Sequence, residues 1–262
     1  MRRIRTIATI TWLEMLRRKD IYVLLILLVS LLFALVSMNI FGLGSVVGFI
    51  KDAGLLTSWL FGYILAVNCA CRQLPQEESR GTIFPLLAKP IRRGELIAGK
   101  WLGTWTIISA AVLCFYLLML LIVKGYGGSF DLMTLIQAFI LHIMALGIVI
   151  ALGIALSTRL NQDAAAAITY VGTAAMFLLV PRVPELAAHA HGWRQTALLI
   201  IYRLFPHFEL FDMRRRAIHQ YGTMHWGIWS VVIVYGAIII SIFLLLAWLG
   251  FYKKHFSRSN ED

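Results

Sequence analysis

The sequence predicts an all-helical integral membrane protein with a single membrane domain over residues 1–262. Of its residues, 60% are hydrophobic and the mean hydropathy is +0.80, whereas soluble domains contain about 45–50% apolar residues even with glycine counted. The formal net charge of +11 comes from Lys and Arg residues that flank the apolar runs. A nucleic-acid-binding protein would gather them in one basic stripe, so we expect lipid contacts and no nucleic-acid partner.

Six apolar runs approach or exceed the about 20 helical residues that cross a bilayer. They cover residues 21–41, 53–71, 101–123, 132–157, 164–180 and 226–251. The first run is longer than a signal-peptide core of about 7–15 residues, so it is taken as a span. The apolar patch at 197–205 is too short to cross, and we expect it to lie in the membrane interface. The sequence therefore predicts six transmembrane helices.

The distribution of Lys and Arg around these runs predicts the orientation. With the N-terminus inside, the inner segments carry 16 of these residues and the outer segments carry 8. Cytoplasmic loops hold an excess of positive charge, so both termini are expected in the cytoplasm. The protein itself is expected in the cell (inner) membrane. The arginines at 214–216 fit this less well, because they fall in the long outer segment 182–225. We expect that segment to lie at the outer interface, with its aromatic residues Phe205, Phe208, Phe211 and Trp193 forming part of an aromatic belt.

The segment 72–100, between the second and third runs, has nine charges in 29 residues. A bare connection between two helices needs only a few polar residues. Here Thr82 can cap a helix, Pro85 fits a first helical turn and Pro90 ends the run. These signals predict a short amphipathic helix of roughly two turns, which cannot span a bilayer.

The order of residues in this segment carries a resemblance. A Glu-rich lead, Gly-Thr, a short apolar helix, Lys-Pro, an Arg pair and a Gly-Lys entering the next span resemble the permease subunits of type-2 ABC transporters. The stretch 12–19 is similar to the surface-lying helix of that family, so residues 1–20 are expected to form an amphipathic cytoplasmic helix. The resemblance covers the whole chain in hydropathy and is residue-specific at about 12–19 and 75–103.

In that family the segment between the second and third spans is a coupling helix that contacts the ATPase subunit. The resemblance therefore implies a separate ABC ATPase, a second permease copy or a related permease, and export as the direction. The implied ATPase-coupling residues are Glu77, Glu78, Arg80, Arg92 and Arg93 for polar contacts, Ile83, Leu86 and Leu87 for a groove, and Gly81, Thr82 and Pro90 in the same helix. The alternative is that these charges only anchor a loop among anionic headgroups.

The spans contain few polar groups, chiefly Asn39, Asn68, Gln137 and His142. Ion-coupled carriers need buried carboxylates or histidines, which are costly in the bilayer. Only His142 could serve, and a hydrogen bond to a neighbouring helix is the favoured explanation of this residue. If the chain moves a substrate, the energy must enter from another subunit.

The run from Gly94 to Lys100 fits the first seven positions of a phosphate-binding loop, but the eighth is Trp101 where Ser or Thr must hold magnesium. The run is predicted to be helical instead. We therefore expect no catalytic residue, cofactor or metal in this chain and no enzymatic activity. The outer histidines, including His189 and His191, match no zinc spacing.

Two other functions stay open at this point. A membrane-embedded enzyme acting on lipids would need clustered carboxylates, histidines or a nucleophile at one interface, and a non-transporting assembly subunit would look like a permease. Small residues four apart, such as Gly99 and Gly103 or Gly147 and Ala151, predict close helix approach, either within the chain or between two permeases, with packing within the chain favoured for the fourth span. An interior poor in charge favours a hydrophobic or amphiphilic cargo.

Overall fold

The structure is a computed structural model that describes residues 2–17, 46–79 and 92–252, with positions 22, 26, 29 and 30. Within those ranges the regular elements are all helices. The long ones are α1 (Arg2–Leu16), α3 (Val46–Ser79), α5 (Arg93–Gly125), α6 (Leu132–Ser157), α7 (Gln162–Leu178) and α11 (Trp226–Tyr252). Between α7 and α11 lie η2 (Val180–Arg182), α8 (Val183–Ala188), α9 (Trp193–Leu204), η3 (Phe208–Phe211) and α10 (Arg214–His219).

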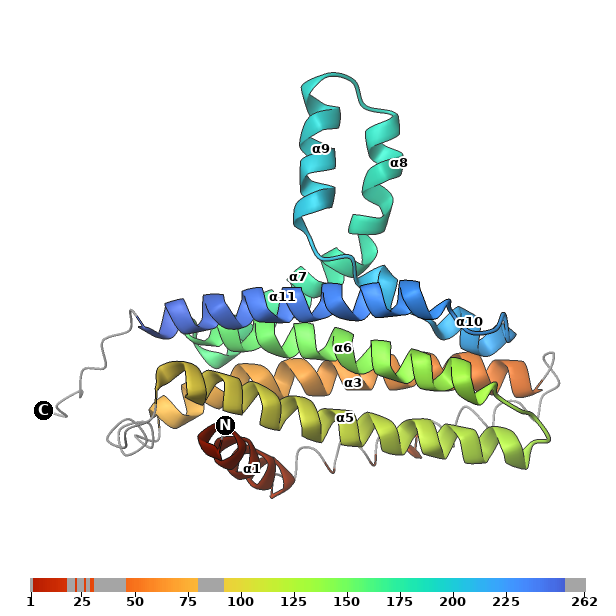
Figure 1. The fold of residues 1–262 in the computed structure, drawn as a ribbon, viewed down its shortest axis with the longest axis horizontal. Helices are drawn as coiled ribbons and strands as arrows, with labels where there is room; N and C mark the ends of the chain where they lie inside the picture. Colours follow the sequence, from red (N-terminus) through yellow and green to blue (C-terminus); the bar gives the residue numbers. More distant parts are fainter. Residues whose placement is uncertain are drawn as a thin grey trace, which may run out of the picture.

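The helices α3, α5, α6 and α11 lie side by side along the long axis of the molecule, as Figure 1 shows. In the described part of the chain, five helices are long and apolar enough to cross a membrane. They correspond to the second through sixth expected spans. The first expected span, 21–41, lies outside the described residues apart from those isolated positions and stays a prediction, as does the short helix expected after Thr82.

The helices α3 and α5 are longer than their expected spans. They contain 34 and 33 residues, which corresponds to ~50 Å of helix against ~30 Å of hydrocarbon. The helix that was expected to leave the membrane at residue 71 continues to Ser79, with Pro75 inside its last turns. Residues 72–79 therefore continue the helix of the second expected span, and the cytoplasmic position of the segment 72–100 stays a prediction.

The helix α6 lies at the centre of the bundle, where small residues allow close packing. A Cβ atom added to Gly153 would lie 3.0 Å from Ala70 Cβ on α3, and one added to Gly147 would lie 3.1 Å from the Trp105 ring on α5. Ala151 is fully buried. The packing role predicted for small residues of the fourth span is confirmed.

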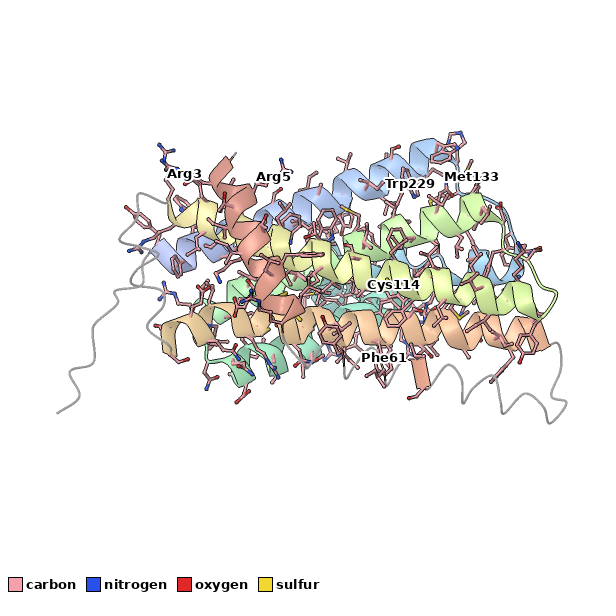
Figure 2. All side chains as sticks on the ribbon, turned by 90° about the horizontal axis from the view of Figure 1, so that it is seen from below. Arg3, Arg5, Phe61, Cys114, Met133 and Trp229 are labelled. Atoms are coloured by element: carbon pink, nitrogen blue, oxygen red, sulfur yellow. The ribbon has the colours of Figure 1, made fainter. Side chains whose placement is uncertain are left out.

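The helix α1 crosses α5 near the start of α5. Figure 2 shows this crossing in a perpendicular view, with Arg3 and Arg5 at the outer edge. A Cβ on Gly99 would lie 2.7 Å from Ile7 Cβ, and one on Gly103 would lie 2.7 Å from the Ala8 carbonyl oxygen. Both glycines are therefore needed for the two backbones to approach this closely.

The segment between α7 and α11 contains two helices that leave the bundle and two short helices that contact it, and its interfacial position stays a prediction. The helices α8 and α9 pack against each other and project from the side of the bundle (Figure 1). The following η3 returns to the bundle, where Phe208 and Phe211 are buried against α6 and α7. Their expected place in an aromatic belt was wrong, because Phe211 fills the space above Gly236, where an added Cβ would lie 3.0 Å from its ring.

The glycine contact between α1 and α5 gives a first prediction. Replacing Gly103 with Val should lower the free energy of unfolding by about 1–3 kcal/mol, because the added side chain overlaps the α1 backbone and Thr11. Thermal unfolding in detergent and tryptic release of an N-terminal tag would measure the loss. Gly125→Val is the matched control, since a Cβ there meets nothing within 4 Å. Equal behaviour of the two variants would contradict the packing argument.

Candidate functional site

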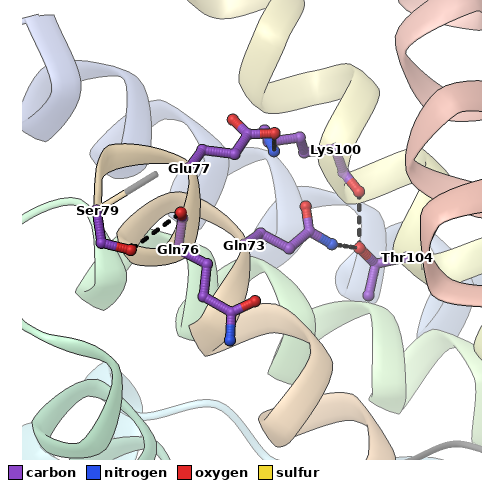
Figure 3. A network of polar contacts seen from close by, with 6 residues as sticks. All are labelled: Gln73, Gln76, Glu77, Ser79, Lys100 and Thr104. Atoms are coloured by element: carbon purple, nitrogen blue, oxygen red, sulfur yellow. Dashed lines mark hydrogen bonds and ion pairs between the residues drawn. The ribbon is translucent and has the colours of Figure 1, made fainter. Parts of the chain in front are cut away.

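The last turns of α3 and the first turns of α5 meet at one end of the bundle, called the charged end below. Gln73 and Glu77 are one helical turn apart on α3, and Lys100 and Thr104 are one turn apart on α5. Residues four apart share a helix face, so the two pairs can face each other. Figure 3 shows that they do.

An ion pair joins the two helices at this end. Lys100 Nζ lies 2.5 Å from Glu77 Oε1, with 3% of the Lys100 side chain and 17% of the Glu77 side chain exposed. A buried ammonium is tolerated only with a close counter-charge, so Glu77 is required by Lys100. The pair therefore fixes the end of α3 against the start of α5.

A second contact lies one turn deeper. Gln73 Nε2 donates a hydrogen bond to the Thr104 hydroxyl, and that hydroxyl donates to the Lys100 carbonyl oxygen at 2.8 Å. The Thr104 hydroxyl thus accepts a hydrogen bond from α3 and donates one within α5. Both side chains are buried, so the contact sets the register of α3 against α5 away from water.

The start of α5 is fixed by Glu95. The Arg92 backbone N–H donates to Glu95 Oε2 at 3.0 Å, which satisfies a backbone donor before the first turn of the helix. Arg3 Nη1 from α1 lies 3.9 Å from the same oxygen. Glu95 therefore belongs both to the helix start and to the contact with α1.

Arg93 connects the start of α5 to the end of α11. Its Nη1 donates to the carbonyl oxygens of Phe251 at 2.8 Å and Tyr252 at 2.7 Å. The guanidinium also lies 5.7 Å and 5.8 Å from the centroids of these two rings. The last carbonyls of a helix lack hydrogen-bond donors within the helix. Arg93 supplies such donors for the last carbonyls of α11.

The predicted coupling residues divide into two sets. Glu77 and Glu78 end α3, and Arg92 and Arg93 begin α5, so the structure brings both flanks of the segment to one end of the bundle. The others lie outside the described residues: Arg80, Gly81, Thr82, Ile83, Leu86, Leu87 and Pro90. Their contact with an ATPase stays a prediction.

Sequence reasoning missed the partners of Glu77. Gln73, Lys100 and Thr104 were not singled out as a contact between helices. The signal was present, because polar residues spaced by four on the flanks of two apolar runs mark one face of each helix. The density of charged residues instead favoured the connection between the two helices as the functional segment.

The structure excludes a phosphate-binding loop at residues 94–100. Residues 94–100 lie within α5, so their backbone N–H groups do not form the loop that cradles a phosphate. The Lys100 ammonium is bound by Glu77. The predicted helical conformation of this run is confirmed.

Three of the four polar groups named for the spans lie in the described part of the chain and contact other helices or connections, and Asn39 lies outside it. Gln137 donates to the Met224 carbonyl at 3.0 Å and accepts from its N–H at 2.8 Å. Asn68 donates to the Tyr170 hydroxyl at 2.9 Å. The fully buried His142 has its Nδ1 3.4 Å from the Tyr116 hydroxyl on α5, as the simpler interpretation predicted.

Two histidines of the segment 182–225 form contacts within the chain. His189 Nδ1 lies 2.8 Å from the Glu185 carbonyl, and His207 Nδ1 lies 3.1 Å from the Tyr235 hydroxyl. Across the residues that the structure describes, no three His, Cys, Asp or Glu side chains are grouped to hold a metal ion. The described histidines thus provide no geometry for a metal centre.

The ion pair at the charged end gives a second prediction. Lys100→Met or Glu77→Gln alone should lower the free energy of unfolding by about 3–5 kcal/mol, because each leaves one group of a buried pair without its counterpart. The double variant should lose less than the sum, which a double-mutant cycle of thermal unfolding would measure. Lys124→Met, at an exposed position of the same helix, should be near neutral. Additive losses would show that the pair does not join the helices.

Comparison with known proteins assigns the family. Two relatives of this chain are each named "Probable ABC transporter permease protein NosY". The chain is 29% identical over 170 residues to the one from Stutzerimonas stutzeri and 31% identical over 169 residues to the one from Pseudomonas aeruginosa. Each alignment covers 59% of this chain and 61% of the relative. The profile described as ABC-2 family transporter protein matches residues 6–255. The chain therefore belongs to the ABC-2 family of transporter proteins.

Proposed function

We propose that this chain is the membrane-spanning subunit of an ABC exporter and is driven by a separate ATPase that binds the segment between α3 and α5. The observation that carries the proposal is the buried contact of Lys100 with Glu77. It joins the two helices that flank the segment, immediately beside the place where an ATPase would press.

The contacts at the charged end connect the segment between α3 and α5 to the ends of four helices. The contact of Glu77 with Lys100 joins α3 to α5, Arg93 joins α5 to α11, and Gly99 and Gly103 seat α1 on α5. A displacement of the segment would then move the ends of four helices together. Long, continuous helices transmit such a displacement, because packed elements shift as rigid bodies.

The extensions of α3 and α5 support a cytoplasmic position for this end. Each helix exceeds the bilayer thickness by ~20 Å, so its charged turns reach beyond the hydrocarbon. Lys and Arg counts favour the side of α1 and the C-terminus as the inner side. In this orientation both termini are cytoplasmic and the connection between α5 and α6 lies outside.

The membrane-facing surface fits a paired permease. The described residues of α7 and α11 expose apolar side chains such as Val171 at 70% and Val231 at 67%. Lipid or a second permease, identical or related, would cover these faces in the cell membrane. The interior contacts are mostly apolar, which favours a hydrophobic or amphiphilic cargo.

The third prediction tests the ATPase contact. A tagged chain purified from its native membranes should bring with it an ATP-hydrolysing subunit, identified by mass spectrometry and by vanadate-sensitive turnover. Replacing residues 82–88 with a Gly-Ser linker of equal length should abolish this co-purification, because the apolar side chains predicted to fill the ATPase groove are lost.

The matched control replaces residues 189–192, between α8 and α9, with a Gly-Ser linker. This variant should retain the ATPase, since the change lies far along the chain from the charged end. Normal ATPase binding and substrate movement after replacement of residues 82–88 would overturn the proposal. So would ATP hydrolysis by the isolated chain.

A further inference from the structure

A cavity of about 230 Å³ lies between α3, α6 and α7. Its walls are formed mainly by apolar and aromatic side chains. They include Trp59, Tyr63, Leu146, Phe177 and Phe208. The cavity lies away from the charged end, because its α3 residues begin at Leu56 whereas the charged end begins at Gln73.

The rim of the cavity is apolar as well. Leu56 and Leu60 on α3 and Leu178 on α7 line it, and each has more than half of its surface exposed. These residues belong to helices long and apolar enough to cross a membrane. The cavity therefore opens toward hydrocarbon, from which a lipid-soluble chain could enter without passing through water.

One cationic side chain lines this apolar cavity. Arg214, the first residue of α10, lies with its guanidinium carbon 5.4 Å from the Trp59 ring centroid. Asp212 accepts from Arg214 Nε at 2.9 Å and from Nη2 at 2.7 Å. Burial lowers the pKa of Arg214, but the hydrogen bond and charge of Asp212 outweigh it and raise the pKa overall.

The pairing with Asp212 does not use all the donors of Arg214. A guanidinium has five N–H groups, and Asp212 binds through Nε and Nη2 only. In the part of the chain that the structure describes, Nη1 of Arg214 makes no hydrogen bond. The N–H groups of Nη1 are therefore not used by Asp212 and are the donors that an oxyanion would bind, and the planar guanidinium matches a carboxylate.

The volume limits what the cavity can hold. An apolar cavity of ~150 Å³ accepts benzene, whereas drug-sized ligands occupy pockets of about 300 Å³ or more. At about 230 Å³ the cavity fits part of one hydrocarbon chain. A two-chain lipid would leave its second chain outside.

We propose that the cavity between α3, α6 and α7 binds a single-chain amphiphile with a carboxylate headgroup, its chain among the aromatic residues and its headgroup on Arg214. The proposal rests on the proposed function, since it names the substrate class of the exporter. The cavity is then the place where the substrate leaves the bilayer.

Photo-crosslinking of the full chain in phosphatidylcholine nanodiscs would test this, without ATP and without the ATPase. The probe is palmitic acid carrying a diazirine and an alkyne, and the comparison probe is the matching alcohol. The acid should label peptides of α3 and α7 that line the cavity, and excess palmitate should compete. The alcohol should label the same peptides several-fold less.

Two pairs of variants make the result specific. Ala174 lines the cavity, so Ala174→Phe should fill part of it and reduce labelling by the acid at least fivefold. Val171→Phe, at an exposed position of the same helix that does not line the cavity, should not. Arg214→Gln should remove the preference for acid over alcohol, whereas Arg215→Gln removes the same charge at an exposed site and should keep it. Should Arg214→Gln fail to fold, Asp212→Asn with Arg214→Gln restores a neutral pair.

Labelling spread evenly over the apolar helices, or unchanged by Ala174→Phe, would overturn the proposal. Equal labelling by acid and alcohol would overturn the role of Arg214, and crosslinks between two chains through these peptides would assign the cavity to a second copy. Each of these results leaves ATPase co-purification untouched. Conversely, cavity labelling without ATPase co-purification would remove the proposed function and leave the binding site.

Discussion

The contact between Lys100 and Glu77 is the interaction on which the charged end depends. A Lys100 side chain that is 3% exposed is stable only beside a counter-charge. The end of α3, which carries Glu77, is therefore held against the start of α5. The segment between them is therefore held at both flanks, whatever it binds. Arg93 extends the same constraint to α11, and Glu95 extends it to α1.

Away from the charged end, close packing at small residues holds the helices together. Gly153 and Gly147 bring α6 against its neighbours, and Gly99 and Gly103 bring α1 against α5. Such contacts gain van der Waals energy without placing polar groups in the membrane. Arg214 departs from this pattern, because a cation lines an otherwise apolar cavity and keeps spare donors beside it.

Much of this arrangement was predictable from the sequence. Hydropathy located five of the described helices, since continuous apolar runs of this length have few alternatives in a bilayer. It did not locate the ends of α3 and α5, because the last turns are polar and their helical state depends on contacts across the bundle. The inward turn of Phe208 and Phe211 was also missed, since exposed and buried aromatic residues look alike until a partner such as Gly236 is placed.

The way Arg93 binds the carbonyls of Phe251 and Tyr252 has a consequence for how the protein assembles. The two partners are separated by 158 and 159 positions along the chain. The final turn of α11 is synthesised after α5, so Arg93 is already part of the chain when the carbonyls that it caps are made. Docking of that turn joins the end of α11 to the start of α5, so this contact of the bundle forms only after both helices have been made.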